Sequence, residues 1–98
     1  MSELVTVCRV TVIADRSLEK RILKQFWQLG IKGYSRMECE GKGENEVIED
    51  VFTGLSRVRI ETIVQPSVGL AILDYLHEPE FDNYGVTTCL ENVQVSND

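Results

Sequence analysis

Hydrophobic positions change their spacing along the chain, and each spacing predicts an element of secondary structure. Residues 4–13 are rich in β-branched types and form too short a run for an ordinary helix, which predicts a first strand. Between residues 17 and 29, apolar positions recur at spacings of four, four and three, so they share one face of a helix. These positions are Leu18, Ile22, Phe26 and Leu29. Gly30 is expected to end this helix.

Two further strands are predicted at residues 33–39 and 55–64, and the second of them alternates regularly. One face of that strand carries the residues expected in the core, which are Ser56, Val58, Ile60, Thr62 and Val64. The other face carries Leu55, Arg57, Arg59, Glu61 and Ile63. Because this second face holds three charged side chains, it is expected to lie on the open side of a sheet.

A second helix is predicted from Pro66, which suits a first helical position, and Pro79 is expected to end it. Residues 86–95 predict a fourth strand. The resulting order, βαββαβ, is that of an α+β, ferredoxin-like fold: a four-stranded antiparallel sheet with two helices on one face. We expect residues 1–98 to form a single domain of this kind. Apolar residues on both sides of the first strand indicate that the open face meets a partner subunit.

The connection between the second and third strands, residues 40–54, is long for an unstructured loop. It opens on Gly41, Lys42 and Gly43. Glycines let successive backbone N–H groups converge, and the lysine adds a positive charge, so this stretch has the parts of an anion cradle. A glycine-containing turn with a solvated lysine is the alternative. Acidic residues fill much of the remaining loop, and their mutual repulsion favours an extended segment.

Charge and composition argue against several functions. With a net charge of −6 at pH 7, the chain lacks the basic face that nucleic-acid binding requires. No apolar run approaches the roughly 20 residues of a membrane span, so we expect a cytoplasmic protein. The three cysteines, Cys8, Cys39 and Cys89, are far apart in the sequence. Since only His77 could join them, we expect buried free thiols, no metal site and no nucleophile–histidine set of an enzyme.

Several of these stretches together resemble the PII signal-transduction family over nearly the whole chain. Gly-Ile-Lys-Gly at 30–33 and Gly-Lys-Gly at 41–43 are similar to the helix end and loop entry of that family. RVRIETIV, residues 57–64, is similar to its third strand. Lys-Gly-Tyr-Ser at 32–35 and FDNYG at 81–85 resemble the branch of SbtB and the carboxysome-associated PII-like proteins.

The resemblance implies a homotrimeric, non-enzymatic regulator with no tightly bound cofactor. Adenine nucleotides would bind in clefts between subunits, and residues 40–54, the T-loop, would change shape with the ligand. In the SbtB-like branch this signals to a membrane bicarbonate transporter in inorganic-carbon uptake, with bicarbonate as a co-ligand on the amides of residues 41–43. Glu44 stands where other members carry an arginine pair, so AMP or ADP would meet less repulsion than a triphosphate.

The residues that the resemblance assigns to nucleotide binding are Ser35, Gly41, Lys42, Gly43, Arg57, Arg59, Glu61, Tyr84 and Gly85. Ser35 and Glu61 would offer a hydroxyl and a carboxylate to a ribose or an adenine edge. A cross-strand hydrogen bond and a salt bridge to Arg59 would explain them equally well. Arg57 and Arg59 would either contact phosphate or pair with acidic groups of an adjoining subunit, and the pairing is favoured.

Three other families share this broad architecture. Acylphosphatases place a phosphate loop after the first strand, where this chain has ADRSLEK without the glycines of such a loop. CutA-like trimers respond to divalent metals and ACT-type modules to amino acids. These last two stay open as alternatives: a trimeric module for a small ligand or a metal.

Overall fold

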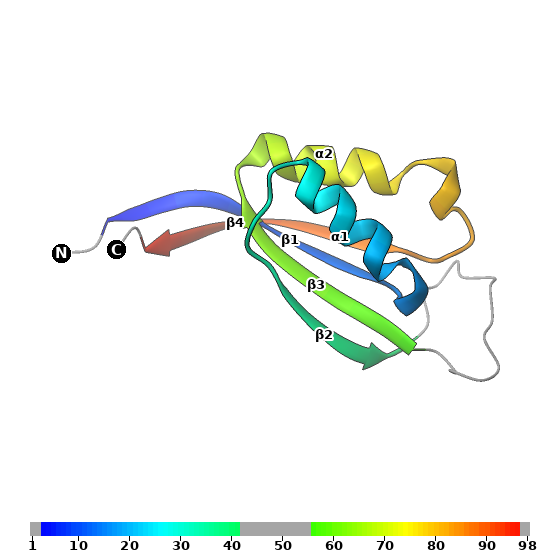
Figure 1. The fold of residues 1–98 in the computed structure, drawn as a ribbon. Coiled ribbons are helices and arrows are strands. Elements are labelled where there is room, and N and C mark those ends of the chain that lie inside the picture. The colour runs from blue at the N-terminus through cyan, green and yellow to red at the C-terminus, as the bar shows by residue number, and fades with distance from the viewer. Residues whose placement is uncertain (1–2, 42–55, 97–98) are drawn as a thin grey trace.

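The computed structural model describes residues 3–41 and 56–96 (Figure 1). Its elements are β1 (Leu4–Asp15), the 3-10 turn η1 (Arg16–Leu18), α1 (Glu19–Gln28), β2 (Ser35–Glu40), β3 (Ser56–Val64), α2 (Pro66–Leu76), the 3-10 turn η2 (Pro79–Phe81) and β4 (Thr87–Ser96). The predicted order of strands and helices is therefore confirmed, with small shifts of the boundaries.

The four strands form one antiparallel sheet in the order β2-β3-β1-β4. Both helices lie on the same face of this sheet (Figure 1). This is the ferredoxin-like arrangement expected from the sequence. Within the part of the chain that the structure describes, no helix covers the opposite face, which we call the open face.

The core lies between the sheet and the two helices. β1 contributes Val10, Val12 and Ala14 and β3 contributes Val58 and Ile60, and none of the five has exposed surface. The helical segments add Leu18, Ile22, Phe26, Ile72 and Leu76. Burying an aliphatic or aromatic side chain of this size stabilises the fold by about 1.5–3 kcal/mol. This packing fixes β1 and β3 at the centre of the sheet, and β3 in turn positions β2.

Local contacts explain where the structure departs from the sequence prediction. The first helix begins as a 3-10 turn, because the carboxylate of Asp15 accepts a hydrogen bond from the backbone N–H of Ser17 at 2.9 Å. Gly30 ends α1 with a φ of 81°, as predicted. The expectation of buried thiols holds for Cys8 alone. Cys39 is half-buried and Cys89 is exposed, since their strands place them on the open face.

Candidate functional site

The predicted site residues separate into two groups at opposite ends of the β2–β3 pair. The strands are antiparallel, with Ser35 opposite Glu61 where β2 begins. Gly41 follows the other end of β2, where a Cβ atom added to it would lie 3.6 Å from the side chain of Arg57. The six residues of β2 separate these ends. At about 3.4 Å per residue they are roughly 20 Å apart.

Two cavities meet at the end where β2 begins. The first has a volume of about 330 Å³ and is lined by Gly33, Tyr34, Ser35, Glu61, Thr62 and Ile63. The second, of about 340 Å³, lies among the α1–β2 connection, the end of β3 and the start of α2, and Lys32 lines it. Gly33 and Ile63 line both, so we name the two cavities together the Gly33 cleft. Each is at the lower end of the size range of small-molecule pockets.

Gly33 is a glycine that its own chain does not require. A Cβ atom built on it would meet no atom within 4 Å, and its φ lies outside the positive range that favours glycine. The bare backbone therefore faces open space inside the cleft. A wall without side chains lets a flat group from outside approach the backbone closely.

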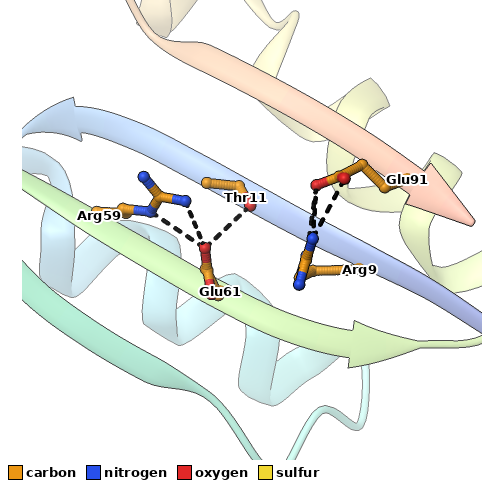
Figure 2. Close-up of polar contacts among 5 residues, drawn as sticks. All are labelled: Arg9, Thr11, Arg59, Glu61 and Glu91. Carbon is orange, nitrogen blue, oxygen red and sulfur yellow. Dashed lines mark hydrogen bonds and ion pairs between the residues drawn. The ribbon is translucent and has the colours of Figure 1, made fainter. Parts of the chain in front are cut away.

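Glu61, a predicted site residue, lines this cleft and is held by two neighbours on the open face (Figure 2). Its Oε1 accepts from Nη2 of Arg59 at 2.7 Å, from Nε of Arg59 at 3.1 Å and from the hydroxyl of Thr11 at 3.4 Å. The hydrogen bond from Arg59 lowers the pKa of Glu61 below its ordinary value, against a smaller opposing effect of desolvation. The cleft is thus bordered by an ionised carboxylate.

A second ion pair lies beside the first one (Figure 2). Nη2 of Arg9 on β1 donates to both carboxylate oxygens of Glu91 on β4, each at 3.2 Å. Arg9 also helps to lower the pKa of Glu61 through its charge. The sequence favoured Arg59 pairing with an adjoining subunit, but the structure gives it a partner in its own chain, and this bond raises the pKa of Arg59.

Arg57 lies at the other end of β3 and is buried, with 3% of its surface exposed. The alternation of the strand predicted instead that it would project from the open face. Its Nη2 donates to the backbone carbonyls of Ile13 at 3.3 Å and of Gly85 at 3.0 Å. The turn before β4 supplies the second carbonyl and therefore lies against the guanidinium. Arg57 thus joins β1, that turn and the loop entry at Gly41.

The structure places the remaining predicted residues as follows. Gly85 adopts a φ of 64°, and Tyr84 is half-buried and packs against the core. Both belong to the turn that meets Arg57, at a distance along the sheet from Ser35 and Glu61 within one chain. Lys42 and Gly43 lie outside the described residues, as does most of the predicted T-loop.

Sequence reasoning did not single out Lys32, Gly33, Thr62 or Ile63 as site residues. Gly33 and Lys32 were noted only as parts of a motif. A signal for the other two existed in their position, because Thr62 and Ile63 directly follow Glu61 on the strand.

Residues 3–41 and 56–96 show neither a cluster of metal ligands nor a membrane-spanning helix. These residues contain no group of three or more His, Cys, Asp or Glu side chains that could hold a metal ion. None of their helices is long and apolar enough to cross a membrane.

Comparisons with known proteins agree with this fold. Residues 7–98 match the family model described as Nitrogen regulatory protein P-II. The chain therefore belongs to the P-II family, as the resemblance in its sequence indicated. A protein from Thermus thermophilus described as a PII-like signaling protein is 38% identical, with a TM-score of 0.76, over 95% of this chain and 92% of that one.

A second similar structure is CPII, described as a nitrogen regulatory PII-like protein from Thiomonas intermedia. Bound to ADP, AMP and bicarbonate, it has a TM-score of 0.81 at 16% identity, over 98% of this chain and 99% of that one. Its apo form has a TM-score of 0.77 at 14% identity and covers both chains fully. At such identities the likeness shows a shared fold. None of the curated proteins compared matches the chain.

Proposed function

We propose that this protein is a PII-like regulator that binds an adenine nucleotide, AMP or ADP in preference, at the Gly33 cleft. The observation that carries the proposal is that the backbone of Gly33 forms a wall of the cleft without a side chain, although an alanine would fit there. An ionised hydrogen-bond acceptor, Glu61, lies beside this wall. The P-II family of the chain and the nucleotides bound to CPII support the choice of ligand.

The chemistry of the cleft suits a nucleoside better than a compact anion. A planar base would lie against the backbone of Gly33 and the side chain of Ile63, which is 47% exposed. The hydroxyl of Ser35 and the carboxylate of Glu61 would accept hydrogen bonds from ribose hydroxyls or the exocyclic amine. Because Glu61 is ionised and the chain is acidic overall, each additional phosphate would increase the repulsion.

A homotrimer would complete this site. In a single chain the turn with Tyr84 and Gly85 lies with Arg57, away from the cleft. A neighbouring copy would bring its own turn to the open side of the cleft. The backbone of residues 41–43 and the ammonium group of Lys42 in that neighbouring copy would then hold the phosphates, with its T-loop beside them.

The output of such a sensor would be the T-loop, residues 40–54, read by a partner. We propose a bicarbonate transporter of the membrane as that partner, in a cytoplasmic pathway of inorganic-carbon uptake, with bicarbonate as a second ligand. The bicarbonate bound to CPII supports the co-ligand. At 16% identity, the likeness to CPII supports a shared fold. The role in carbon uptake is to be tested by measuring bicarbonate binding and the interaction with a transporter.

Isothermal titration calorimetry tests the nucleotide proposal directly. AMP, ADP, ATP and cyclic AMP are titrated into the full chain, each with and without bicarbonate, and AMP or ADP is expected to bind most tightly. Lys42→Ala should weaken binding by about 1.5–3 kcal/mol, the contribution of a charged hydrogen bond. Lys24→Ala, on the exposed surface of α1, is the matched control and should bind as the wild type does.

Three results would contradict parts of the proposal. Binding of amino acids or divalent metals in place of nucleotides would favour the ACT-like or CutA-like alternative. Unchanged affinity in Lys42→Ala would remove this lysine from the site. A monomer in sedimentation velocity, at concentrations where nucleotide binds, would exclude the inter-subunit cleft.

A further inference from the structure

A hydrogen bond from the side chain of Thr62 joins β3 to the segment before β2. Its hydroxyl donates to the backbone carbonyl of Gly33 at 2.7 Å, and Thr62 is 3% exposed. The register of β2 and β3 begins two residues later, at the Ser35–Glu61 pair. Gly33 therefore lies beyond the strand ladder, and the threonine hydroxyl attaches it to β3.

This hydrogen bond joins two residues that line the Gly33 cleft. Glu61, Thr62 and Ile63 are consecutive, so their side chains alternate between the two faces of the sheet. Glu61 is held on the open face by Arg59, whereas Thr62 reaches Gly33 from the opposite face. Three adjacent residues of one inner strand therefore line the cleft and connect to the segment on its other side.

We infer that Thr62 is a positioning residue, because its hydroxyl is bonded to the carbonyl of Gly33 and acts on the ligand through that segment. Without the hydroxyl, the carbonyl of Gly33 loses its partner on β3 and the segment 33–34 is free to move away from Ile63. A ligand that binds between residues 33–34 and Ile63 would then have to order this segment on binding. The entropy cost of that ordering would weaken its affinity. The inference rests on the proposed function for its ligand, but the hydrogen bond is independent of it.

Two substitutions separate the hydrogen bond from packing. Thr62→Val keeps a β-branched side chain of nearly the same shape and removes the donor. Thr62→Ser keeps the donor and removes the methyl group. Thr88→Val is the matched control, since Thr88 lies in β4, in the same sheet, and does not line the cleft. The two readouts are the amide hydrogen exchange of residues 33–35 in ligand-free protein and the calorimetric affinity for AMP.

In Thr62→Val, exchange at residues 33–35 and the dissociation constant for AMP should both rise about fivefold to tenfold, as for the loss of one net hydrogen bond. Thr62→Ser and Thr88→Val should stay within about twofold of wild type in both measurements. Unchanged exchange in Thr62→Val would overturn the inference whatever the protein binds. Equal losses in Thr62→Ser and Thr62→Val would assign the effect to packing of the methyl group and would also overturn it.

If the wild type binds no AMP, the proposed nucleotide function is wrong. The exchange measurement would still test whether Thr62 orders the segment at Gly33. The two failures are therefore distinguishable. Normal AMP affinity in Thr62→Val, with faster exchange, would show that the hydroxyl orders Gly33 without influencing the ligand, and so would reject the positioning role.

Discussion

The two ends of the β2–β3 pair each carry a glycine and a charged side chain but differ in what surrounds them. At one end a buried cation, Arg57, fills the space between β1 and the turn before β4 and bonds to backbone carbonyls. At the other end Glu61 borders a cleft with a bare glycine in its wall. A side chain of the protein itself lies buried at the first end, whereas the second end has a cleft of the size of a small-molecule pocket.

This difference teaches that a charged residue cannot be assigned a role from its type and strand face alone. Arg57 and Arg59 lie two residues apart on β3, where alternation places them on one face. Arg57 is 3% exposed, whereas 44% of the Arg59 side chain is exposed. The two arginines differ in what packs against them: the turn at Gly85, distant in sequence, lies against Arg57.

The largest expected effect is the loss of the buried arginine. Arg57→Met leaves the carbonyls of Ile13 and Gly85 without this donor in a buried site, and unsatisfied buried groups cost about 1–3 kcal/mol each. We expect the free energy of unfolding to fall by about 2–4 kcal/mol in urea titration. Arg59→Met, on the same strand but exposed, is the control and should change it much less. Equal effects of the two substitutions would remove the contrast between the two ends.

A smaller effect, on binding without loss of stability, is expected at the open end. Gly33→Ala places a methyl group into the cleft where nothing in the chain opposes it. Its stability should stay level or rise by up to about 1 kcal/mol, because alanine restricts the unfolded chain. Affinity for AMP should fall at least tenfold, or about 1.4 kcal/mol, because the methyl group occupies the wall that a base would approach.

Gly30→Ala is the control for the stability of this variant. Gly30 has a φ of 81° at the end of α1, so alanine there should destabilise the fold by about 1–2 kcal/mol. Thermal unfolding of both variants shows the cost of backbone strain at Gly30 and its absence at Gly33. Because Gly30 lines the second cavity, the AMP affinity of Gly33→Ala is compared with that of the wild type. If Gly33→Ala bound AMP as the wild type does, the ligand would have to lie elsewhere.

The smallest effect is the pH dependence that Arg59 confers on Glu61. The folded pKa of Glu61 lies below its ordinary value, so its contribution to stability is complete above the ordinary carboxyl range. The contribution is lost as the pH falls from about 5 through the folded pKa. The difference in Tm between wild type and Glu61→Gln should therefore be constant near neutral pH and shrink in acid. In an Arg59→Gln background this change with pH should be much weaker, and an equal slope in both backgrounds would show that Arg59 is not its cause.

The sequence predicted most of the fold because its periodicities are local. The helix from Pro66 follows its apolar spacing, and the face of β3 with Val58 and Ile60 is buried as its alternation required. Ser35 and Glu61, which the resemblance assigned to one site, lie opposite each other on β2 and β3.

The remainder of the site depends on contacts that no local pattern contains. A buried threonine in a strand is explained by β-propensity alone, so nothing in the sequence indicated that Thr62 bonds to Gly33. The burial of Arg57 depends on a carbonyl 28 residues away in the chain. The open space beside Gly33 is a property of the folded surface, so the spacing of residues in the sequence could not predict it.

The central position of β1 has a consequence for how the chain folds. The strand joins the sheet between β3 and β4, and its residue Leu4 lies opposite Ser96. Pairing of segments so distant in sequence requires the closure of a large loop before any contact compensates for the lost chain entropy, and such topologies fold slowly. During synthesis on the ribosome, β1 would have to wait for its last partner until residue 96 has emerged. The apolar strand has an unpaired edge for that time. Chaperone engagement and translation speed should therefore influence the yield of folded protein.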